Sequence, residues 1–191
     1  STSTLWASGW IARRATNDTT KWSTEIDTLH AIGRYSFVDP NVLNGFVYLI
    51  GGFVPIQPPP VPTENDPEPF PFEGTGDVLV YTPLGMTADP PAVAGAWVSL
   101  PPASSFPMPA MHHIVAVAHQ GKIWALGGHA GPFAPTGGIF VFTPESEASP
   151  AGTWSQIRVS DGAPCGAGDT CLDLPSPRSA GAVVSFGDRI Y

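Results

Sequence analysis

Four histidines, His112, His113, His119 and His129, lie close together in the second half of the chain. Imidazole is the most frequent protein ligand for transition metals, so a metal site is the first chemistry to consider. Adjacent residues of a β-strand point to opposite faces, however, and His112 and His113 could then share one ion only at a bulge. His119 lies near a turn at the far end of the following apolar run, and His129 follows a glycine pair. We therefore expect packing and turn roles for these histidines, with neither a metal ion nor another cofactor.

Motifs for common hydrolytic and phosphate chemistry are missing from the sequence. It contains no Gly-x-Ser-x-Gly elbow, no His-Glu-x-x-His motif and no glycine-rich phosphate loop ending in Lys-Ser or Lys-Thr. The carboxylates Glu64, Asp66, Glu68 and Glu73 belong to a flexible proline-rich stretch, where a fixed acid–base pair is not expected. We predict no catalytic residue, and the sequence favours a non-enzymatic role.

The two cysteines of the chain, Cys165 and Cys171, are separated by a short stretch that contains two glycines. Such a stretch lets the two sulfurs meet, and we predict a local disulfide. Two free thiols are the alternative, and a zinc site is less favoured because the nearby residues do not supply four ligands. Asn17 begins an Asn-Asp-Thr sequon for N-glycosylation in a polar segment. Together, a disulfide and a glycosylated sequon favour a secreted or cell-surface protein.

The composition of the 191-residue chain restricts its fold class. It contains 23 prolines spread along its length, and a proline inside a helix removes a backbone donor and breaks the helix. A helical bundle or a coiled coil is thereby excluded. We predict an all-β protein made of strands and loops.

Charge and hydropathy exclude further classes of function. The formal net charge is −8 at pH 7, which repels the phosphate backbone of nucleic acids. The longest apolar runs, which begin at Phe46 and His113, are far shorter than the ~20 residues of a transmembrane helix. The chain opens without Met and without a basic segment followed by an apolar one. We therefore expect a processed or truncated chain whose signal peptide is absent or already removed.

An internal repeat organises the chain. Each complete unit has an apolar strand ending in a glycine pair, a second strand running into Thr-Pro, and a short strand led by Trp. The first unit contains GFVYLIGG (45–52), DVLVYTP (77–83) and AWVSLPP (96–102), and the second contains GKIWALGG (121–128), GIFVFTP (138–144) and TWSQI (153–157). The glycine pairs are Gly51-Gly52 and Gly127-Gly128.

Partial units flank the two complete ones. Segment 1–27 matches the second half of a unit, 28–102 and 103–157 are complete units, and 158–191 holds the two cysteines and the first half of another unit. The first complete unit carries a proline-rich insertion, 54–72, whose prolines favour polyproline II. A decorated loop and an exposed docking segment are both open interpretations of this insertion.

These units resemble the kelch repeat over nearly the whole chain. The matching motifs are VYLIGG, VYTP and WVSL in one unit, IWALGG, VFTP and WSQI in the next, and PSPRSAGAVVSFGDRIY at the start of a third. The resemblance implies a kelch-type β-propeller segment built of four-stranded antiparallel blades. The chain holds about three blades, whereas closed propellers typically have four to eight. We therefore expect the remaining blades to come from further sequence or from another chain, with a miniature three-bladed ring as the alternative.

The resemblance also implies where a ligand would bind. In kelch propellers that bind peptides, the starts of the innermost strands line the mouth of the central channel, and the matching residues here are Arg34, Tyr35, His112, His113, Arg178 and Ser179. Solvation or packing between blades is the alternative role for each of them.

The function that the resemblance implies is an extracellular scaffold that binds a protein or glycan through its loops. Two alternatives stay open. One is a segment of a copper-radical carbohydrate oxidase similar to galactose oxidase, which needs a Tyr bonded to a Cys. The other is a structural subunit of a cell-surface assembly.

Overall fold

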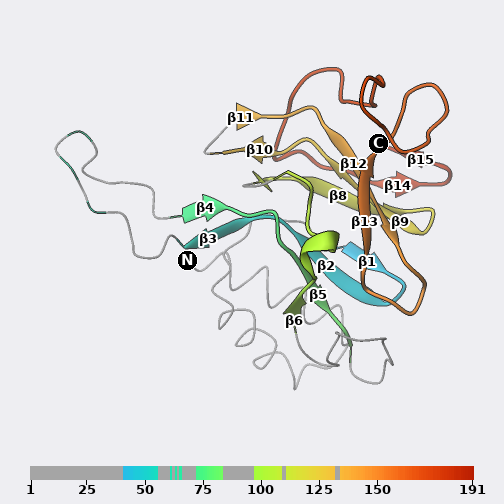
Figure 1. Ribbon diagram of the computed structural model, residues 1–191, viewed down its shortest axis with the longest axis horizontal. Coiled ribbons are helices and arrows are strands. Elements are labelled where there is room, and N and C mark those ends of the chain that lie inside the picture. Colours follow the sequence, from blue (N-terminus) through green and yellow to red (C-terminus); the bar gives the residue numbers. More distant parts are fainter. Residues whose placement is uncertain are drawn as a thin grey trace.

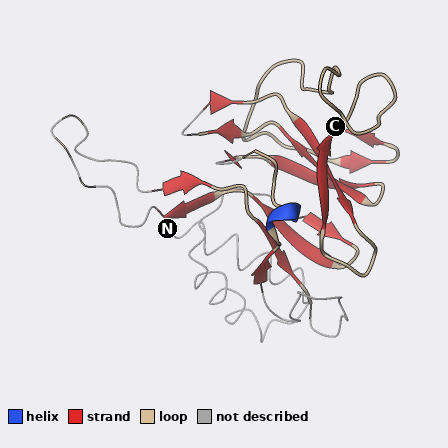
Figure 2. Cartoon of the chain, viewed as in Figure 1, coloured by secondary structure: helices blue, strands red, loops and turns tan. Residues whose placement is uncertain are grey.

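The computed structural model of the chain describes residues 41–55, 61, 63, 65, 72–83, 97–108, 111–131 and 134–191 (Figure 1). In these residues all regular structure is β-sheet apart from one 3-10 turn, η2 (Pro102–Ser104) (Figure 2). The prediction of an all-β protein is therefore confirmed. The sequon at Asn17, the candidate residues Arg34 and Tyr35, and the expected half-unit 1–27 lie outside the described residues.

The first four-stranded sheet is an antiparallel meander with the strand order β1-β2-β5-β6. Its strands are β1 (Asn41–Leu43), β2 (Phe46–Ile50), β5 (Val78–Tyr81) and β6 (Trp97–Ser99). Every residue of β2 and β5 is buried, so both faces of this sheet are covered. Continuous apolar runs such as FVYLI and VLVY are typical of strands in that position.

The second four-stranded sheet repeats this meander, with the order β13-β12-β9-β8. Its strands are β8 (Val115–His119), β9 (Lys122–Leu126), β12 (Ile139–Pro144) and β13 (Gly152–Gln156). The first two strands of each sheet are joined by the same turn, made by Asn44-Gly45 in one sheet and Gln120-Gly121 in the other, all with positive φ. Two-residue turns of this kind match the right-handed twist of the strands that they connect.

Three smaller sheets contain the remaining strands of the described residues. β3 (Phe53–Pro55) pairs with β4 (Phe72–Gly74), so the two ends of the proline-rich insertion form a hairpin, and most of the residues between them are outside the described part. β10 (His129–Ala130) lies between β11 (Ala134–Pro135) and β7 (Met111–His112). The last hairpin consists of β14 (Ser185–Phe186) and β15 (Arg189–Ile190). Figure 1 shows β3, β4, β10 and β11 projecting from the same side of the molecule.

The glycine pairs form the same junction in both units. The amide of Gly52 donates to the carbonyl oxygen of Met111 at 2.9 Å, and the amide of Gly128 donates to the carbonyl oxygen of Arg178 at 3.0 Å. In both cases the acceptor belongs to the following unit, Met111 to 103–157 and Arg178 to 158–191. Each glycine pair therefore ties the end of one strand to the next part of the chain.

The first glycine of each pair has no room for a side chain. Gly51 and Gly127 have φ values of 67° and 61°, in the left-handed region that favours glycine. A Cβ atom on Gly51 would lie 2.6 Å from the Met111 carbonyl oxygen, and one on Gly127 would overlap the Arg178 carbonyl oxygen. Both glycines therefore combine a positive φ with a close approach of two backbone segments.

The two four-stranded sheets pack face to face through one apolar core. Tyr48 and Val80 belong to the first sheet, Ile123 and Phe142 to the second, and all four share a single buried cluster. The ring centroids of Tyr48 and Phe142 lie 5.5 Å apart. Burial raises the pKa of the Tyr48 phenol, whose hydroxyl donates to the Pro150 carbonyl oxygen at 3.2 Å.

The two repeat tryptophans show that the sheets stack in the same sense. Trp154 lies opposite Phe142 in the second sheet and packs against the core between the sheets. Trp97 lies opposite Tyr81 in the first sheet and belongs to a separate buried cluster on that sheet's other face. The face of the second sheet that carries Trp154 thus packs against the face of the first sheet that does not carry Trp97. Successive sheets of a stack in which every sheet has the same orientation meet in this way.

The segment after β13 is held by a disulfide and by one arginine. Cys165 and Cys171 are bonded, with their Cα atoms 5.8 Å apart, which confirms the predicted disulfide. Arg158 donates to both carboxylate oxygens of Asp161 at 2.9 Å and to Asp169 at 3.3 Å. In the described part of the chain, no helix has the length and apolar character that crossing a membrane requires.

Candidate functional site

Three histidines meet at the edge of the molecule where the second glycine pair ends. His112 belongs to β7 and is followed by His113, while β10 begins with His129 directly after Gly128. His112 and His129 are direct cross-strand partners in the pairing of β7 with β10. The centroids of the three imidazole rings lie 4.9, 5.1 and 5.3 Å apart. We refer to His112, His113 and His129 as the histidine cluster.

The expectation that His112 and His113 point to opposite faces is wrong. His113 has a φ of 54°, in the left-handed region, so it does not continue the alternation of β7. The Nδ1 atoms of the two rings consequently lie 2.6 Å apart and share a hydrogen bond. The amide of Ala180 donates to the His113 carbonyl oxygen at 3.1 Å and holds the backbone in this turn. The positive φ of His113 therefore brings the two imidazole rings together, for which the alternation of a regular strand would require a β-bulge.

Hydrogen bonds outside the cluster orient two of the rings. His112 Nε2 lies 2.9 Å from the Gly131 carbonyl oxygen. A carbonyl oxygen can only accept, so Nε2 carries the proton, and Nδ1 of the neutral ring presents its lone pair toward His113. On the other side, His129 Nε2 lies 2.8 Å from the Ser179 hydroxyl oxygen. Both rings thus have one nitrogen engaged outside the cluster.

An aromatic ring and partial burial surround the histidines. Phe53, the residue after the first glycine pair, stacks on His112 with ring centroids 4.1 Å apart and an interplanar angle of 28°. His112 is completely buried, whereas His113 and His129 are partly exposed. Burial lowers the pKa of His113, and charge repulsion from His112 and then from His129, when those rings are protonated, lowers it further. The neutral imidazole of His113, the form that donates a lone pair, is favoured as a result.

The structure separates the predicted binding residues. It brings His112, His113 and Ser179 together at the cluster. The side chain of Arg178 is exposed and donates to the Ser176 hydroxyl at 2.9 Å. Arg178 contributes to the junction through its backbone, since its carbonyl oxygen accepts from the Gly128 amide at 3.0 Å and its amide donates to the Thr136 carbonyl oxygen at 3.1 Å. Arg34 and Tyr35 lie outside the described residues.

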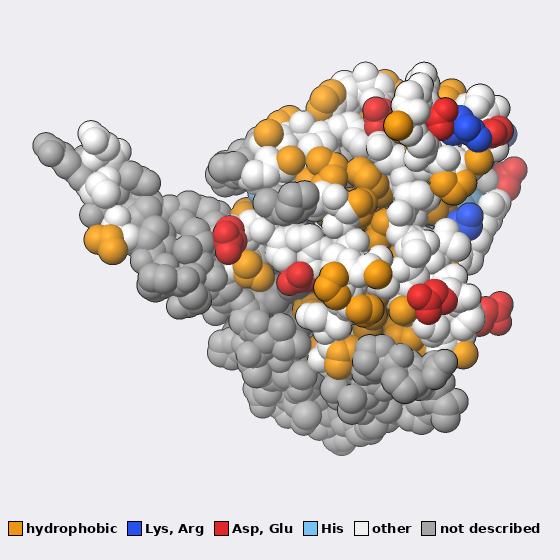
Figure 3. All heavy atoms as spheres, in the orientation of Figure 1, with side chains coloured by type: hydrophobic (Ala, Val, Ile, Leu, Met, Phe, Trp, Pro, Cys, Tyr) orange, Lys and Arg blue, Asp and Glu red, His pale blue; other side chains and the backbone are white. Residues whose placement is uncertain are grey.

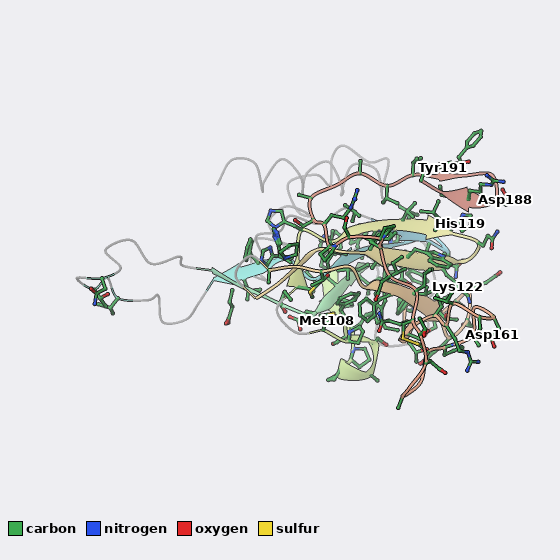
Figure 4. The ribbon with its side chains drawn as sticks, turned by 90° about the horizontal axis from the view of Figure 1, so that it is seen from above. Met108, His119, Lys122, Asp161, Asp188 and Tyr191 are labelled. Carbon is green, nitrogen blue, oxygen red and sulfur yellow. A yellow bond between two sulfur atoms is a disulfide. The ribbon has the colours of Figure 1, made fainter. Side chains whose placement is uncertain are left out.

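His129 is the residue that the predicted binding set lacks. It follows the second glycine pair as Phe53 follows the first, and Phe53 and His129 both contact His112. The repeat register could therefore have identified His129 as a neighbour of His112. His119 lies elsewhere, beside the last hairpin that carries Asp188 and leads to Tyr191 (Figure 4), and its Nδ1 is 2.8 Å from the Ser185 hydroxyl oxygen.

The donor atoms of the cluster are close enough to share a ligand. One ring nitrogen from each histidine lies within 4.8 Å of the other two, and no fourth His, Cys, Asp or Glu of the described segments joins this group. An all-imidazole donor set suits a transition metal ion. No model of a known protein family matches the chain, and no curated protein is significantly similar to it. The kelch resemblance accordingly stays a prediction based on the repeat motifs.

Proposed function

We propose that this chain is a segment of a kelch-type β-propeller and serves as a secreted or cell-surface scaffold that binds a protein or glycan. The ligand would bind at the edge where the glycine pairs meet the following strand starts. Further sequence or another chain would supply the remaining blades. The disulfide between Cys165 and Cys171 supports an oxidising compartment.

The repetition of one junction in two successive units carries this proposal. Gly52 with Met111 and Gly128 with Arg178 make equivalent hydrogen bonds, and each lies between one four-stranded meander and the next segment. Sheets that stack in the same sense through equivalent junctions fan around an axis, which is the geometry of a propeller. Residues at the strand starts, among them Ser179, then face a common edge.

Charge supports a protein or glycan ligand over a nucleic acid. The net charge of the chain is −8. Among the described residues on the face shown in Figure 3, the basic side chains are few and stand apart from one another. Such a surface offers little to a phosphate backbone.

Two exposed arginines provide a matched test. Arg178 lies at the proposed binding edge, whereas Arg189 lies on β15 and is 72% exposed. The full chain would be screened on arrays of glycans and of extracellular proteins, and each hit would be titrated with the Arg178→Glu and Arg189→Glu variants. We expect at least a tenfold loss of affinity for Arg178→Glu only, equivalent to about 1.4 kcal/mol. An equal loss in both variants, or no ligand in either array, would contradict the proposal.

A structural role in an assembly is the second candidate. The last hairpin leaves apolar side chains in solvent, with Phe186 76% and Tyr191 64% exposed. Exposed apolar groups of this kind favour association between chains. Sedimentation over a concentration series should then show assembly that Phe186→Ser weakens. A monomer at every concentration would exclude this role.

The oxidase alternative receives no support from the cysteines of this chain. A copper-radical site of that kind needs a cysteine bonded to a tyrosine, and Cys165 and Cys171 are bonded to each other. Any such site would have to use a cysteine from other sequence. Peroxide release by the purified protein with sugars or alcohols would favour the oxidase.

A further inference from the structure

We propose that His112, His113 and His129 bind one divalent transition metal ion of the zinc and copper class. The proposal is independent of the scaffold function, because it rests on the contacts among these three side chains. Its starting point is that one nitrogen of each ring lies within 4.8 Å of the others. The three ligands come from two paired strands, with His112 and His129 in register and His113 folded back by its positive φ.

The outer hydrogen bonds match those of metal-bound histidines. A histidine that ligates a metal through one nitrogen usually donates its other N–H to a carbonyl, carboxylate or water, which fixes the tautomer and the ring orientation. His112 has this arrangement, with Nε2 on the Gly131 carbonyl oxygen at 2.9 Å. His129 has a similar one, with Nε2 on the Ser179 hydroxyl at 2.8 Å. The inner nitrogen of His112 is therefore a lone-pair donor directed into the cluster.

The spacing requires only a small adjustment for a metal ion. The Nδ1 atoms of His112 and His113 are 2.6 Å apart. Zinc–nitrogen bonds of about 2.0–2.1 Å in a tetrahedral site separate two ligand atoms by about 3.3 Å. A rotation of the partly exposed His113 ring supplies this difference without moving the buried His112. The proton shared between the two Nδ1 atoms then moves to His113 Nε2 or is released, so that both Nδ1 lone pairs face the ion.

The donor set selects the class of metal. Imidazole nitrogens suit Zn²⁺, Cu²⁺, Co²⁺ and Ni²⁺, whereas Ca²⁺ and Mg²⁺ prefer oxygen ligands. Three protein ligands occupy three positions of a tetrahedral ion, and a water molecule or an anionic group from a bound ligand can take the fourth. This is the ligand count of zinc sites that keep an open position.

The test measures Zn²⁺ binding to the full chain after chelator treatment. Competition against a chromogenic chelator should give one ion per wild-type chain. His113→Gly removes a ligand at a positive φ that glycine adopts freely, and His129→Gln removes another. We expect each to lose more than about 100-fold in affinity, while Ser179→Ala, which alters only an outer hydrogen bond, loses about tenfold. His119→Gln removes a histidine outside the cluster and should bind Zn²⁺ as the wild type does.

A spectroscopic readout on the wild-type protein avoids any dependence on variant folding. Addition of Zn²⁺ should shift the ¹⁵N resonance of His112 Nδ1 and leave that of His119 unchanged. Addition of Co²⁺ should give the strong visible absorption of a four-coordinate ion. Absence of a stoichiometric Zn²⁺ site in the wild type, or equal losses in His119→Gln and His113→Gly, would overturn the proposal. Arg178→Glu should bind Zn²⁺ as the wild type does, although it should lose affinity for the protein or glycan ligand. The two proposals can therefore fail independently of each other.

Discussion

The amide of Gly128 donates a hydrogen bond of 3.0 Å to the carbonyl oxygen of Arg178, which ties the end of β9 to the segment before the last hairpin. This bond forms only because Gly127 turns the chain at a φ of 61° and lets the two backbones approach. The glycine pair therefore determines how one repeat unit meets the next. The same dependence holds for Gly51 and Gly52 at the previous junction.

Replacing Gly127 by Ala should strongly destabilise the protein. The new Cβ atom would overlap the Arg178 carbonyl oxygen and would also force alanine into a left-handed φ. We expect Gly127→Ala to lower the free energy of unfolding by roughly 3 kcal/mol or more, measured by urea denaturation. Gly121→Ala is the matched control, because Gly121 has a φ of 71° with nothing within 4 Å of its added Cβ. The control should lower the free energy of unfolding by only about 1 kcal/mol, the cost of placing alanine at a left-handed φ. Equal losses in the two variants would contradict the steric argument.

The side chain of Ser104 should stabilise the second sheet. Its hydroxyl donates to the Gly152 carbonyl oxygen at 2.8 Å and accepts from the Gly152 amide at 3.1 Å, and both residues are buried. Ser104→Ala removes both bonds from buried backbone groups, so we expect a loss of about 2 kcal/mol in the free energy of unfolding. The neighbouring Ser105, which is only partly buried, offers Ser105→Ala as a control with an effect within about 0.5 kcal/mol. If Ser104→Ala were as stable as Ser105→Ala, this anchoring role would be wrong.

Much of the sheet structure could be predicted because local residue types specify it. The apolar runs of β2 and β9 end at glycine pairs, and the last strand of each four-stranded sheet carries a tryptophan, Trp97 in β6 and Trp154 in β13. The β3–β4 hairpin was not predicted. Pro55 at the end of β3 argues against a strand, and its partners lie at the other end of a proline-rich insertion.

The histidine cluster could not be predicted from strand alternation alone. Its geometry depends on the positive φ of His113, which a non-glycine residue seldom adopts and which hydrogen bonding by Ala180 maintains. It also depends on the register that places His129 opposite His112. The first depends on a contact with the following unit, and the second depends on the pairing of β7 with β10 inside one unit. The spacing of residues along the chain specifies neither.

The disulfide should be present in the protein purified without reductant. Cys165 and Cys171 close a short loop, so replacing both by Ser should lower the free energy of unfolding by about 2 kcal/mol. Proteolysis between the two cysteines followed by mass spectrometry should give one linked species that reduction separates. Two unlinked peptides in the unreduced digest would refute the bond.

The carboxyl group of Asp161 should titrate below its ordinary range. Hydrogen bonds from the Arg158 side chain, and then from the Ala163 amide, lower the pKa of Asp161 from the ordinary value of 3.8. Because the pKa is lower in the folded state than in the unfolded state, the interaction contributes stability above pH 3.8 and loses it as the pH falls through the folded pKa. Carboxyl ¹³C titration should show that Arg158→Gln raises the pKa of Asp161 toward its ordinary value. Arg178→Gln serves as the control, since Arg178 donates to the Ser176 hydroxyl rather than to a carboxylate. An Asp161 pKa that is the same in wild type and Arg158→Gln would show that the arginine does not hold this carboxylate in solution.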